Sequence, residues 1–313
     1  MIEKNSKILI IGANGFVGKN LVNKFKILGF NNLLTPSSKE LNVLDFEKVS
    51  EYFCENKPDS IIFLAAEYGG VNACKVNAPE YLSKNSYMAL NVLNNAIKSN
   101  VHKFVYISSA TIYPENSPQP IKEEYLLSGK LVPSVEGYAL AKIVGTKLTY
   151  MIGEKYRVPY FTLVPTNMYG PYDRFGDPNS NVVASLIWKI HYAKVENKPY
   201  VELFGTGTPK RDLLFVEDFV DAIIYFLLNY NGNDWINIGS NSEISIKELA
   251  LLLKEIIGYK GEIYFNRNYP DGATRRLLCI EKAKKLGWEP KINIYEGLEK
   301  TYKWFLDKIK IGG

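Results

Sequence analysis

Tyr138 and Lys142 are a tyrosine and a lysine four positions apart. On a helix this spacing places both side chains on the same face. A free tyrosine has a pKa of about 10, and a neighbouring ammonium group lowers that value by stabilising the phenolate. The pair therefore predicts a tyrosine that donates or accepts a proton near neutral pH. The alternative is an ordinary tyrosine–lysine pair on a helix surface.

A glycine-rich turn lies near the N-terminus, between a predicted strand over 7–11 and a predicted helix near 16–28. Gly12 allows the tight turn, Gly15 lets a phosphate approach the backbone, and Gly18 lets the helix pack on the strand. A turn of this kind before a helix binds the pyrophosphate of a dinucleotide. An ordinary glycine turn is the alternative. The prediction assigns three neighbours to the same cofactor site: Asn14, Phe16 and Val17.

The segment 34–39 bears on the choice between NAD and NADP. An acidic residue in this region would bind the ribose 2′-hydroxyl of NAD, but no carboxylate precedes Glu40. The hydroxyls of Ser37 and Ser38 and the ammonium group of Lys39 suit a 2′-phosphate, so the sequence favours NADP. A solvated loop is the alternative. Five further residues are placed along the cofactor, the first of them at the adenine: Asp45, Leu64, Ala65, Ala66 and Pro165.

Ser109 follows a predicted strand over 103–107. Beside a nicotinamide, its hydroxyl would hydrogen-bond the carbonyl oxygen of a ketone. Tyr138 would give or take the proton of that oxygen while hydride moves from or to the nicotinamide. Together with Lys142, these residues predict a hydride-transfer enzyme. A nucleotide-sensing protein without catalysis is an alternative from a different class.

The elements that position these residues alternate between short apolar strands and helical stretches over the first half of the chain. This alternation predicts an α/β fold with a Rossmann-like, doubly wound parallel sheet, and its end after residue 165 predicts a smaller α/β substrate lobe. We expect residues 1–168 and 213–240 to form the NADP-binding domain, and residues 169–212 and 241–313 to form the lobe. The predicted strands are 7–11, 60–65, 103–107, 160–164 and 200–204, and the predicted helices lie near 16–28, 46–56, 79–99, 135–156, 181–195, 217–229, 245–257 and 295–309.

The composition is that of a soluble globular protein, with 46% apolar and 23% charged residues among 313. The net charge of +5 is too mild to indicate nucleic acid, but it suits an anionic ligand such as a nucleotide. No apolar run reaches ~18 residues, so no membrane span is predicted, and the first strand begins too early to leave room for a signal peptide. We therefore expect a cytoplasmic protein with reduced thiols. The cysteines and histidines are scattered and predict no metal site: Cys54, Cys74, Cys279, His102 and His191.

Further motifs extend over nearly the whole chain. They occupy residues 40–45, 64–70, 108–114, 138–142, 165–171, 204–212, 237–240, 269–275 and 286–288. With these motifs the chain resembles the extended short-chain dehydrogenases/reductases that act on nucleotide sugars. More narrowly, it resembles the GDP-L-fucose synthases, which are GDP-4-keto-6-deoxymannose epimerase/reductases, and the later motifs separate it from UDP-galactose epimerases. The resemblance implies a GDP-linked 4-keto sugar as substrate. It also implies a homodimer formed through the helix that carries Tyr138 and the helix near 79–99. The apolar side chains of the helix near 79–99 could instead pack in the core of the protein, which is the alternative.

At two positions that the resemblance links to epimerisation, this chain departs from the family. The family has Ser-Ser-Cys-Ile-Tyr-Pro where this chain has one residue more, and matching residues 112–114 makes Ser109 the catalytic serine and places Thr111 at the catalytic cysteine. Asn181 stands where the resemblance implies the catalytic histidine. Removing a proton beside a ketone needs a group that titrates near pH 7, and neither an amide nor an aliphatic hydroxyl does so. Related dehydratases resemble one another in carrying Asp-Glu where this chain has Ala110 and Thr111, so dehydration is not expected.

The sequence therefore favours a C4 reductase that lacks C3/C5 epimerase activity. Such an enzyme would reduce a GDP-4-keto-6-deoxy sugar, hexose or heptose, either directly or after a separate epimerase. The first alternative is a complete, bifunctional GDP-L-fucose synthase. In that enzyme Glu67, Tyr113 or Lys189 would have taken over the acid/base role.

The resemblance also implies the substrate-binding residues. Arg211 and Lys189 match basic positions that meet the diphosphate, although Lys189 replaces the usual arginine and so exchanges a bidentate fork for a point charge. Asn167 would hydrogen-bond the sugar or the nucleotide, and Phe204, in place of a tryptophan, would stack on the base. Loop ion pairs and simple packing are the alternatives. The remaining predicted substrate residues are Thr111, Asn181 and Val182, with Asp271 and Arg275 closing over the nucleotide.

Overall fold

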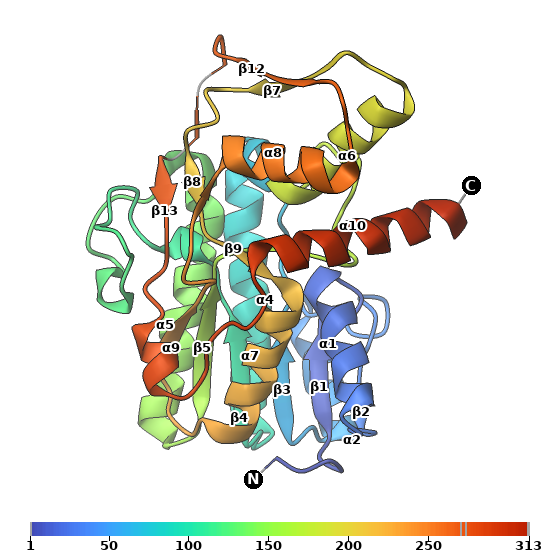
Figure 1. The fold of residues 1–313 in the computed structure, drawn as a ribbon. Coiled ribbons are helices and arrows are strands. Elements are labelled where there is room, and N and C mark those ends of the chain that lie inside the picture. The colour runs from blue at the N-terminus through green and yellow to red at the C-terminus, as the bar shows by residue number, and fades with distance from the viewer. Residues whose placement is uncertain (1, 270, 273, 312–313) are drawn as a thin grey trace.

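The computed structural model describes residues 2–269, 271–272 and 274–311; Pro270 and Ala273, within the motif 269–275, lie outside the described residues. A sheet of parallel strands forms the centre of the protein (Figure 1). It has six strands in the order β10-β5-β4-β3-β1-β2. The chain moves from β1 to β2 on one side and then to β3 on the other. The crevice between β1 and β3 is thus the switch point at which such sheets bind ligands, and the expected doubly wound α/β fold is confirmed. The strands are β1 (Ile8–Ile11), β2 (Leu33–Leu34), β3 (Ser60–Phe63), β4 (Lys103–Ile107), β5 (Tyr160–Pro165) and β10 (Trp235–Ile238).

The sequence predicts four of these six strands, with bounds within two residues of those observed, and does not predict β2 or β10. β2 is too short to show a periodic pattern, because it has only two residues. β10 contains the polar Asn237, which is fully buried. Its side-chain amide donates to the carbonyl of Ile121 at 3.0 Å, so its polarity is satisfied by a residue far away in the sequence.

Helices cover both faces of the sheet. On one face, α1 (Phe16–Ile27) and α7 (Val216–Asn229) share a core with alternate strand residues such as Ile8 and Ile10. On the other face, α2 (Phe46–Asn56), α4 (Ala78–Lys98) and α5 (Glu136–Tyr156) share a second core. Because both faces are covered, the strands are apolar throughout rather than alternating.

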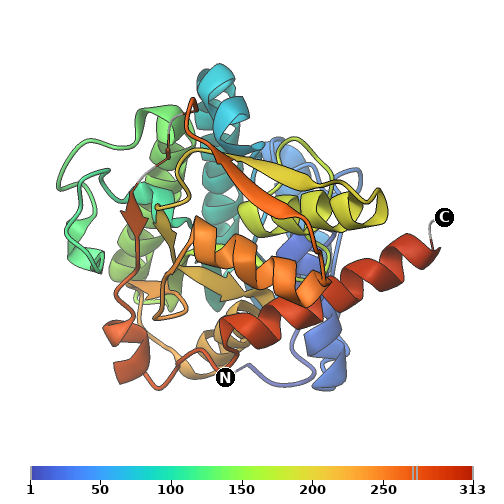
Figure 2. The same ribbon diagram turned by 45° about the horizontal axis from the view of Figure 1, so that its top comes forward.

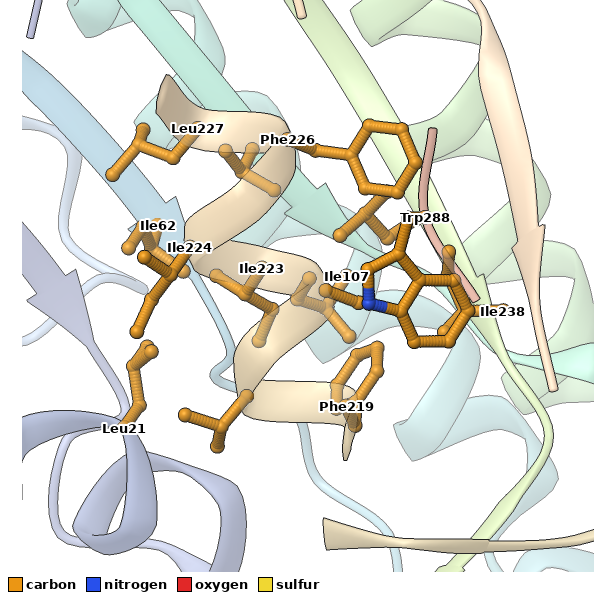
Figure 3. Packing of buried hydrophobic residues seen from close by; sticks show 14 of the residues in the cluster. Leu21, Ile62, Ile107, Phe219, Ile223, Ile224, Phe226, Leu227, Ile238 and Trp288 are labelled. Atoms are coloured by element: carbon orange, nitrogen blue, oxygen red, sulfur yellow. The ribbon is translucent and has the colours of Figure 1, made fainter. Parts of the chain in front are cut away.

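The core under α7 shows how the sheet is held (Figure 3). Phe219 and Ile223 of α7 are fully buried and pack with Ile62 of β3 and Ile107 of β4 in the same cluster. Burying side chains of this size stabilises the fold by roughly 1.5–3 kcal/mol each. The sheet that positions the site is therefore fixed from the side of α7 as well as from the side of α5.

A smaller lobe lies over the carboxyl ends of the strands, opposite the N-terminus (Figures 1 and 2). Its helices α6 (Val182–Val195), α8 (Ile246–Ile257) and α10 (Ile294–Ile311) share a third core with the parallel strands β7 (Tyr200–Phe204) and β12 (Glu262–Asn266). The remaining elements are short: α3 (Gly70–Val76), α9 (Glu281–Lys285), β6 (Asn167–Tyr169), β8 (Lys210–Arg211), β9 (Leu213–Phe215), β11 (Ile244–Ser245), β13 (Arg275–Arg276) and the 3-10 turns Ala110–Ile112, Glu123–Tyr125 and Pro133–Val135.

Asp212 ties three segments together at the junction of the lobes. Its carboxylate accepts from the backbone N–H and the hydroxyl of Ser240, at 2.9 and 2.7 Å, and from the N–H of Leu278 at 3.3 Å. Burial raises the pKa of this carboxyl to about 6, although these hydrogen bonds oppose the rise.

None of the helices in the described ranges has both the length and the apolar character needed to cross a membrane.

Candidate active site

The predicted catalytic residues lie where α5 packs on the end of β4. Tyr138 and Lys142 are both buried in the first turns of α5, and Ser109 follows β4 by two residues. The Lys142 ammonium nitrogen donates to the carbonyl of Ile107 at 2.8 Å, which fastens α5 to the strand end before Ser109. The same nitrogen lies 5.9 Å from the centre of the Tyr138 ring and 4.9 Å from that of Tyr106. The structure thus brings the predicted tyrosine and lysine together.

Burial controls the protonation of this pair. It lowers the pKa of Lys142 to about 7. It also raises the pKa of Tyr138 far above its usual value, and the neighbouring phenols of Tyr106 and Tyr68 add to the rise. Desolvation disfavours the charged forms of both residues, so the structure shows no lowering of the pKa of Tyr138 by Lys142, and stabilisation of a Tyr138 phenolate by Lys142 stays a prediction. A tyrosine held in its neutral form is set to donate a proton.

Ser109 and Thr111 are linked through their hydroxyls. Ser109 caps the 3-10 turn Ala110–Ile112, and its oxygen accepts from the backbone N–H of Thr111 at 3.3 Å. The same oxygen accepts from the Thr111 hydroxyl at 3.0 Å. Position 111, where the resemblance implies a cysteine, therefore contacts the predicted catalytic serine directly.

Arg276 holds this turn from the other lobe. One of its guanidinium nitrogens lies 3.3 Å from the carbonyl oxygen of Ala110 and 3.4 Å from that of Tyr113, and donates to both. The sequence points to Arg275 and not to Arg276, because adjacent strand residues point to opposite faces and the sequence does not tell which one faces the turn.

Tyr68 is a second residue that contacts the site without being among the predicted site residues. Its ring lies 4.9 Å from that of Tyr138, at an interplanar angle of 54°. Burial raises the pKa of its phenol to about 12. Tyr68 falls inside the motif 64–70, but nothing in the sequence indicates that this position reaches across to α5.

A polar cavity of about 180 Å³ lies between the two parts of the protein. It brings together Asn167 and Asn181 with Arg211, three of the predicted substrate residues. Amide and guanidinium groups are suited to hydrogen-bonding a sugar hydroxyl or a phosphate. Val182, a fourth predicted substrate residue, also lines this cavity. The other lining residues are Tyr68, Gly70, Met168, Asn179, Ser180, Val183 and Leu213.

Asp173 lies beside the predicted position of the family histidine. Its two carboxylate oxygens are 3.4 and 3.5 Å from the amide nitrogen of Asn181. Burial raises the pKa of Asp173 to about 6, opposed by the N–H of Arg174 and the amide of Asn181. Asn181 lines the polar cavity and Asp173 does not. The sequence does not indicate a role for this carboxyl, which lies two positions beyond the motif 165–171.

A larger cavity of about 600 Å³ is lined by Asp271 and Arg275. Both side chains have partners in the protein. Asp271 accepts from the N–H and the hydroxyl of Thr206, at 2.9 and 2.6 Å, and Arg275 donates to Glu243 at 2.6 Å. Closure of these two residues over a nucleotide stays a prediction. The cavity is also lined by Lys75, Glu115, Asn116, Val132, Pro133, Ser134, Gly272 and Thr274.

Phe204 and Lys189 lie together on the rim of the lobe. The Phe204 ring stacks on Tyr269, with 3.9 Å between the ring centres and 24° between the planes. The Lys189 nitrogen lies 5.4 Å from the centre of the Phe204 ring, so the cation and the aromatic face form one exposed group. Stacking of Phe204 on a base stays a prediction.

The predicted cofactor turn has the shape that a dinucleotide needs. Gly12 has φ +95°, and a Cβ there would lie 2.9 Å from the backbone nitrogen of Ala65, two residues after β3. A Cβ on Gly18 would overlap the carbonyl of Gly12, so α1 packs directly on the turn. A cavity of about 210 Å³ lies beside this turn. Its lining residues are Ile11, Gly12, Asn14, Gly15, Pro36, Ser37, Ser38, Leu41, Val43 and Ala65.

Other predicted cofactor residues have structural partners. The Asp45 carboxylate caps α2 by accepting from the N–H groups of Glu47 and Lys48, at 3.0 and 3.1 Å. A contact from Asp45 to the adenine therefore stays a prediction. Six further residues lie outside the lining of the 210 Å³ cavity: Phe16, Val17, Lys39, Leu64, Ala66 and Pro165.

The residues considered as replacement acid/base groups are engaged elsewhere. Glu67 pairs with Lys84 at 3.2 Å. The Tyr113 hydroxyl is fully buried and donates to the side-chain oxygen of Asn237 at 2.6 Å. Lys189 lies over Phe204, as described above. In the part of the chain that the structure describes, no three histidine, cysteine or acidic side chains form a group that could hold a metal ion.

Known proteins are similar to this chain in sequence over nearly its whole length. Residues 8–239 match the NAD dependent epimerase/dehydratase family. GDP-L-fucose synthase 1 from Arabidopsis thaliana is 37% identical over 313 residues, covering 99% of this chain and 96% of that protein. A solved GDP-6-OMe-4-keto-L-xylo-heptose reductase from C. jejuni has a TM-score of 0.93 at 31% identity, covering 98% of this chain and 99% of the other. A GDP-mannoheptose C4 reductase from Campylobacter jejuni, solved with NADP bound, has a TM-score of 0.91 at 31% identity, covering 98% of this chain and all of the other. By the match over residues 8–239 and the identity to the A. thaliana relative, the chain belongs to the NAD-dependent epimerase/dehydratase family.

Proposed function

We propose that the protein is an NADPH-dependent reductase that reduces C4 of a GDP-4-keto-6-deoxy sugar, hexose or heptose, without epimerising C3 or C5. One observation carries the proposal. The groups that reduction needs, Tyr138 and Lys142, lie together beside the strand end that carries Ser109, whereas the positions that epimerisation needs hold Thr111 and Asn181. Reduction requires a polarised carbonyl and a proton donor, but epimerisation also requires a group that removes a carbon-bound proton.

The residues of the turn fit an NADP molecule. When bound, the cofactor supplies the hydride. The turn at Gly12 and the N-terminus of α1 would hold the pyrophosphate, because no side chain stands between the backbone and the cavity there. Ser37 and Ser38 line the same cavity and would bind the 2′-phosphate through their hydroxyls. Lys39 is exposed beside them and would add a positive charge.

The catalytic residues would act on the C4 oxygen. Ser109 donates a hydrogen bond to this oxygen, which polarises the carbonyl. As hydride adds to C4, the electron pair of the carbonyl bond moves to the oxygen, and the oxygen takes the proton of the neutral Tyr138. The phenolate left behind is stabilised by the nearby Lys142 ammonium, and a pKa of about 7 lets Lys142 return a proton at working pH.

The solved relatives support reduction as the main activity. Two of them carry names that describe reductases of GDP-heptoses, one explicitly at C4. The curated relative from A. thaliana is named a GDP-L-fucose synthase. These names support a GDP-sugar as the substrate and leave both a hexose and a heptose to be tested.

A bifunctional epimerase/reductase is the second candidate, and one observation favours it. Asp173 has a pKa of about 6 and lies against Asn181. A carboxyl with this pKa can exchange protons near neutral pH. In this structure Asn181 and not Asp173 lines the cavity, so the carboxyl would need to act through the amide, which does not titrate.

Solvent deuterium separates the two candidates. The enzyme is run with NADPH and GDP-4-keto-6-deoxymannose in D₂O, beside a sample without enzyme, and the product is examined by NMR. We expect unlabelled C3 and C5 and a retained configuration. Deuterium at both carbons, with a fucose product, would show that the protein is bifunctional. A GDP-4-keto-heptose run in parallel gives the preferred sugar from the ratio of kcat/KM values.

A Tyr138→Phe variant checks that the observed turnover belongs to this site. The substitution removes the proton donor and keeps the ring that packs against Tyr68. We expect hydride transfer to fall by about 10²–10⁴-fold, the usual contribution of a general acid, with NADPH affinity largely retained. Unchanged turnover in this variant would sink the assignment of Tyr138.

A homodimer through α4 and α5 is part of the proposal. Large apolar side chains on these helices are exposed: Tyr87 by 59%, Val144 by 38% and Met151 by 57%. Met151→Glu is expected to shift the mass measured by light scattering from dimer to monomer. Ile27→Glu on α1, at a position that is 80% exposed on the other face of the sheet, is the matched control and should leave the mass unchanged. A monomeric parent protein would contradict the dimer.

A further inference from the structure

We propose that Thr111 is a positioning residue that commits the Ser109 hydroxyl to donating its hydrogen bond to the C4 oxygen of the substrate. The inference rests on the proposed function, because it concerns the carbonyl that the enzyme reduces. It gives the residue at the position of the family cysteine a task of its own in reduction.

The hydrogen-bonding capacity of the Ser109 hydroxyl is limited. A serine hydroxyl has one proton to donate and two lone pairs that accept. In this structure both accepting positions of Ser109 are used by one residue: the Thr111 N–H approaches at 3.3 Å and the Thr111 hydroxyl at 3.0 Å. The proton of Ser109 is the part of the group that is left for another partner. A hydroxyl fixed in this way donates and does not accept.

The surrounding backbone keeps this arrangement in place. Arg276 donates to the carbonyls of Ala110 and Tyr113, on either side of Thr111. Lys142 donates to the carbonyl of Ile107, just before the turn. The Ala110–Ile112 turn is therefore held from α5 and from β13, while threonine is itself restricted at χ1 by its branched Cβ. A donor fixed before the substrate arrives needs little reorganisation during the reaction.

A cysteine in the same place would act differently. Its thiol is a weak hydrogen-bond donor and can ionise near neutral pH. A thiolate would accept the serine proton and turn it away from the substrate. Threonine at position 111 thus removes a group that could take a proton from carbon and supplies a firm donor to Ser109 at the same time. Neither Thr111 nor Ser109 gains or loses a proton in the step; the proton that reaches the C4 oxygen comes from Tyr138.

The test is a double-mutant cycle on single-turnover NADPH oxidation with the GDP-4-keto sugar, so that product release does not hide the chemical step. Thr111→Val keeps the shape and removes the hydroxyl, and we expect it to slow hydride transfer about 10–100-fold, as for a lost hydrogen bond to a developing charge. Thr111→Ser restores the hydroxyl and should recover most of the rate. In a Ser109→Ala background, Thr111→Val should cost less than about 3-fold, because the group it positions is gone.

Controls separate this role from a structural one. NADPH affinity and the melting temperature show whether each variant is folded. Thr301→Val, which removes a buried threonine hydroxyl on α10, should leave the rate unchanged. Equal rates for Thr111→Val and the parent, or equal losses in both backgrounds, would overturn the inference. Deuterium in the parent's product would overturn only the reductase-only proposal, because the cycle measures hydride transfer alone. No NADPH oxidation by the parent with any GDP-4-keto sugar would overturn both.

Discussion

The carboxylate of Asp173 faces the side-chain amide of Asn181, with its oxygens 3.4 and 3.5 Å from the amide nitrogen. A buried acid of this kind is a good partner for an imidazolium, which donates in the same way as the amide. The structure therefore retains the support for a titrating residue at position 181 although the chain carries an asparagine there.

The first prediction restores that residue. In the double variant Thr111→Cys/Asn181→His, the thiol and the imidazole supply two groups that titrate near neutral pH, and Asp173 would hold the imidazolium in place. We expect deuterium from D₂O to appear at C3 or C5 in the majority of product molecules, where the parent incorporates none. A variant that still oxidises NADPH and incorporates no deuterium would show that the support is lost. The single variants are the controls.

The second prediction concerns the loss of unfolding free energy when the buried carboxyl of Asp173 ionises. Its folded pKa of about 6 lies above the value of 3.8 expected without burial, so the folded state binds the proton more tightly. Unfolding free energy therefore falls as the pH rises from 3.8 to 6 and is constant above that window. A shift of this size corresponds to roughly 3 kcal/mol at most. Asp173→Asn should remove this part of the decline when urea unfolding is measured at pH 4 and 6.5.

The matched control for Asp173 is Asp307→Asn, which changes an exposed carboxylate on α10. This variant should follow the parent at both pH values. Asp212, whose pKa burial also raises to about 6, stays in place in both variants, so its contribution cancels in the comparison. Parallel pH profiles for the parent and Asp173→Asn would contradict the raised pKa.

The third prediction concerns the cost of burying Lys142. Burial lowers its pKa from 10.5 to about 7, so the unfolded state binds the proton more tightly between these values. The resulting penalty is fully present at and below pH 7 and disappears as the pH approaches 10.5. At pH 7 we expect the unfolding free energy of Lys142→Met to exceed that of the parent by up to roughly 4 kcal/mol. Urea unfolding measures this difference, and the variant should unfold at a higher urea concentration. The difference should shrink by pH 10, and a gap independent of pH would exclude the lowered pKa as its cause.

The fourth prediction concerns the 2′-phosphate. Ser38 lines the cavity beside the cofactor turn, so Ser38→Asp would place a carboxylate near the phosphate. Like charges at this separation repel by about 1–3 kcal/mol in a partly solvated site, which corresponds to a 10–100-fold weaker NADPH affinity. NADH affinity should change little. Fluorescence titration measures the dissociation constants of NADPH and NADH. Ser83→Asp on the exposed face of α4 is the control. Equal weakening of both cofactors by Ser38→Asp would place the 2′-phosphate elsewhere.

The sequence predicts best where one local pattern decides the structure. The strand over 103–107 and the helix over 46–56 are found with the predicted bounds, because an apolar run and a capped amphipathic run each carry their own signal. The sequence does not predict β2 because its two residues are too few to show a period. It does not predict β10 because that strand contains the polar Asn237, whose amide is hydrogen-bonded to Ile121 outside the strand. Such pairings depend on partners far along the chain.

The site follows the same division. Tyr138 and Lys142 are recognisable because their spacing along one helix is itself the signal. The contacts of Tyr68 with Tyr138 and of Asp173 with Asn181 depend on the paths of loops. The spacing of residues in the sequence does not indicate such contacts. The sequence predicts the pKa of Tyr138 from Lys142 alone, whereas in the structure burial and the phenols of Tyr106 and Tyr68 raise it.

The last strand of the large sheet, β10, comes late in the chain. It pairs with β5 only after the segments of the smaller lobe that contain α6 and β7 have been made. On the ribosome, the nucleotide-binding half is therefore incomplete until residue 238 has emerged, and until then β5 presents a bare edge that could pair with other chains. A truncation after residue 168 would leave that edge open permanently, so the two halves of this enzyme are best expressed as a single uninterrupted polypeptide.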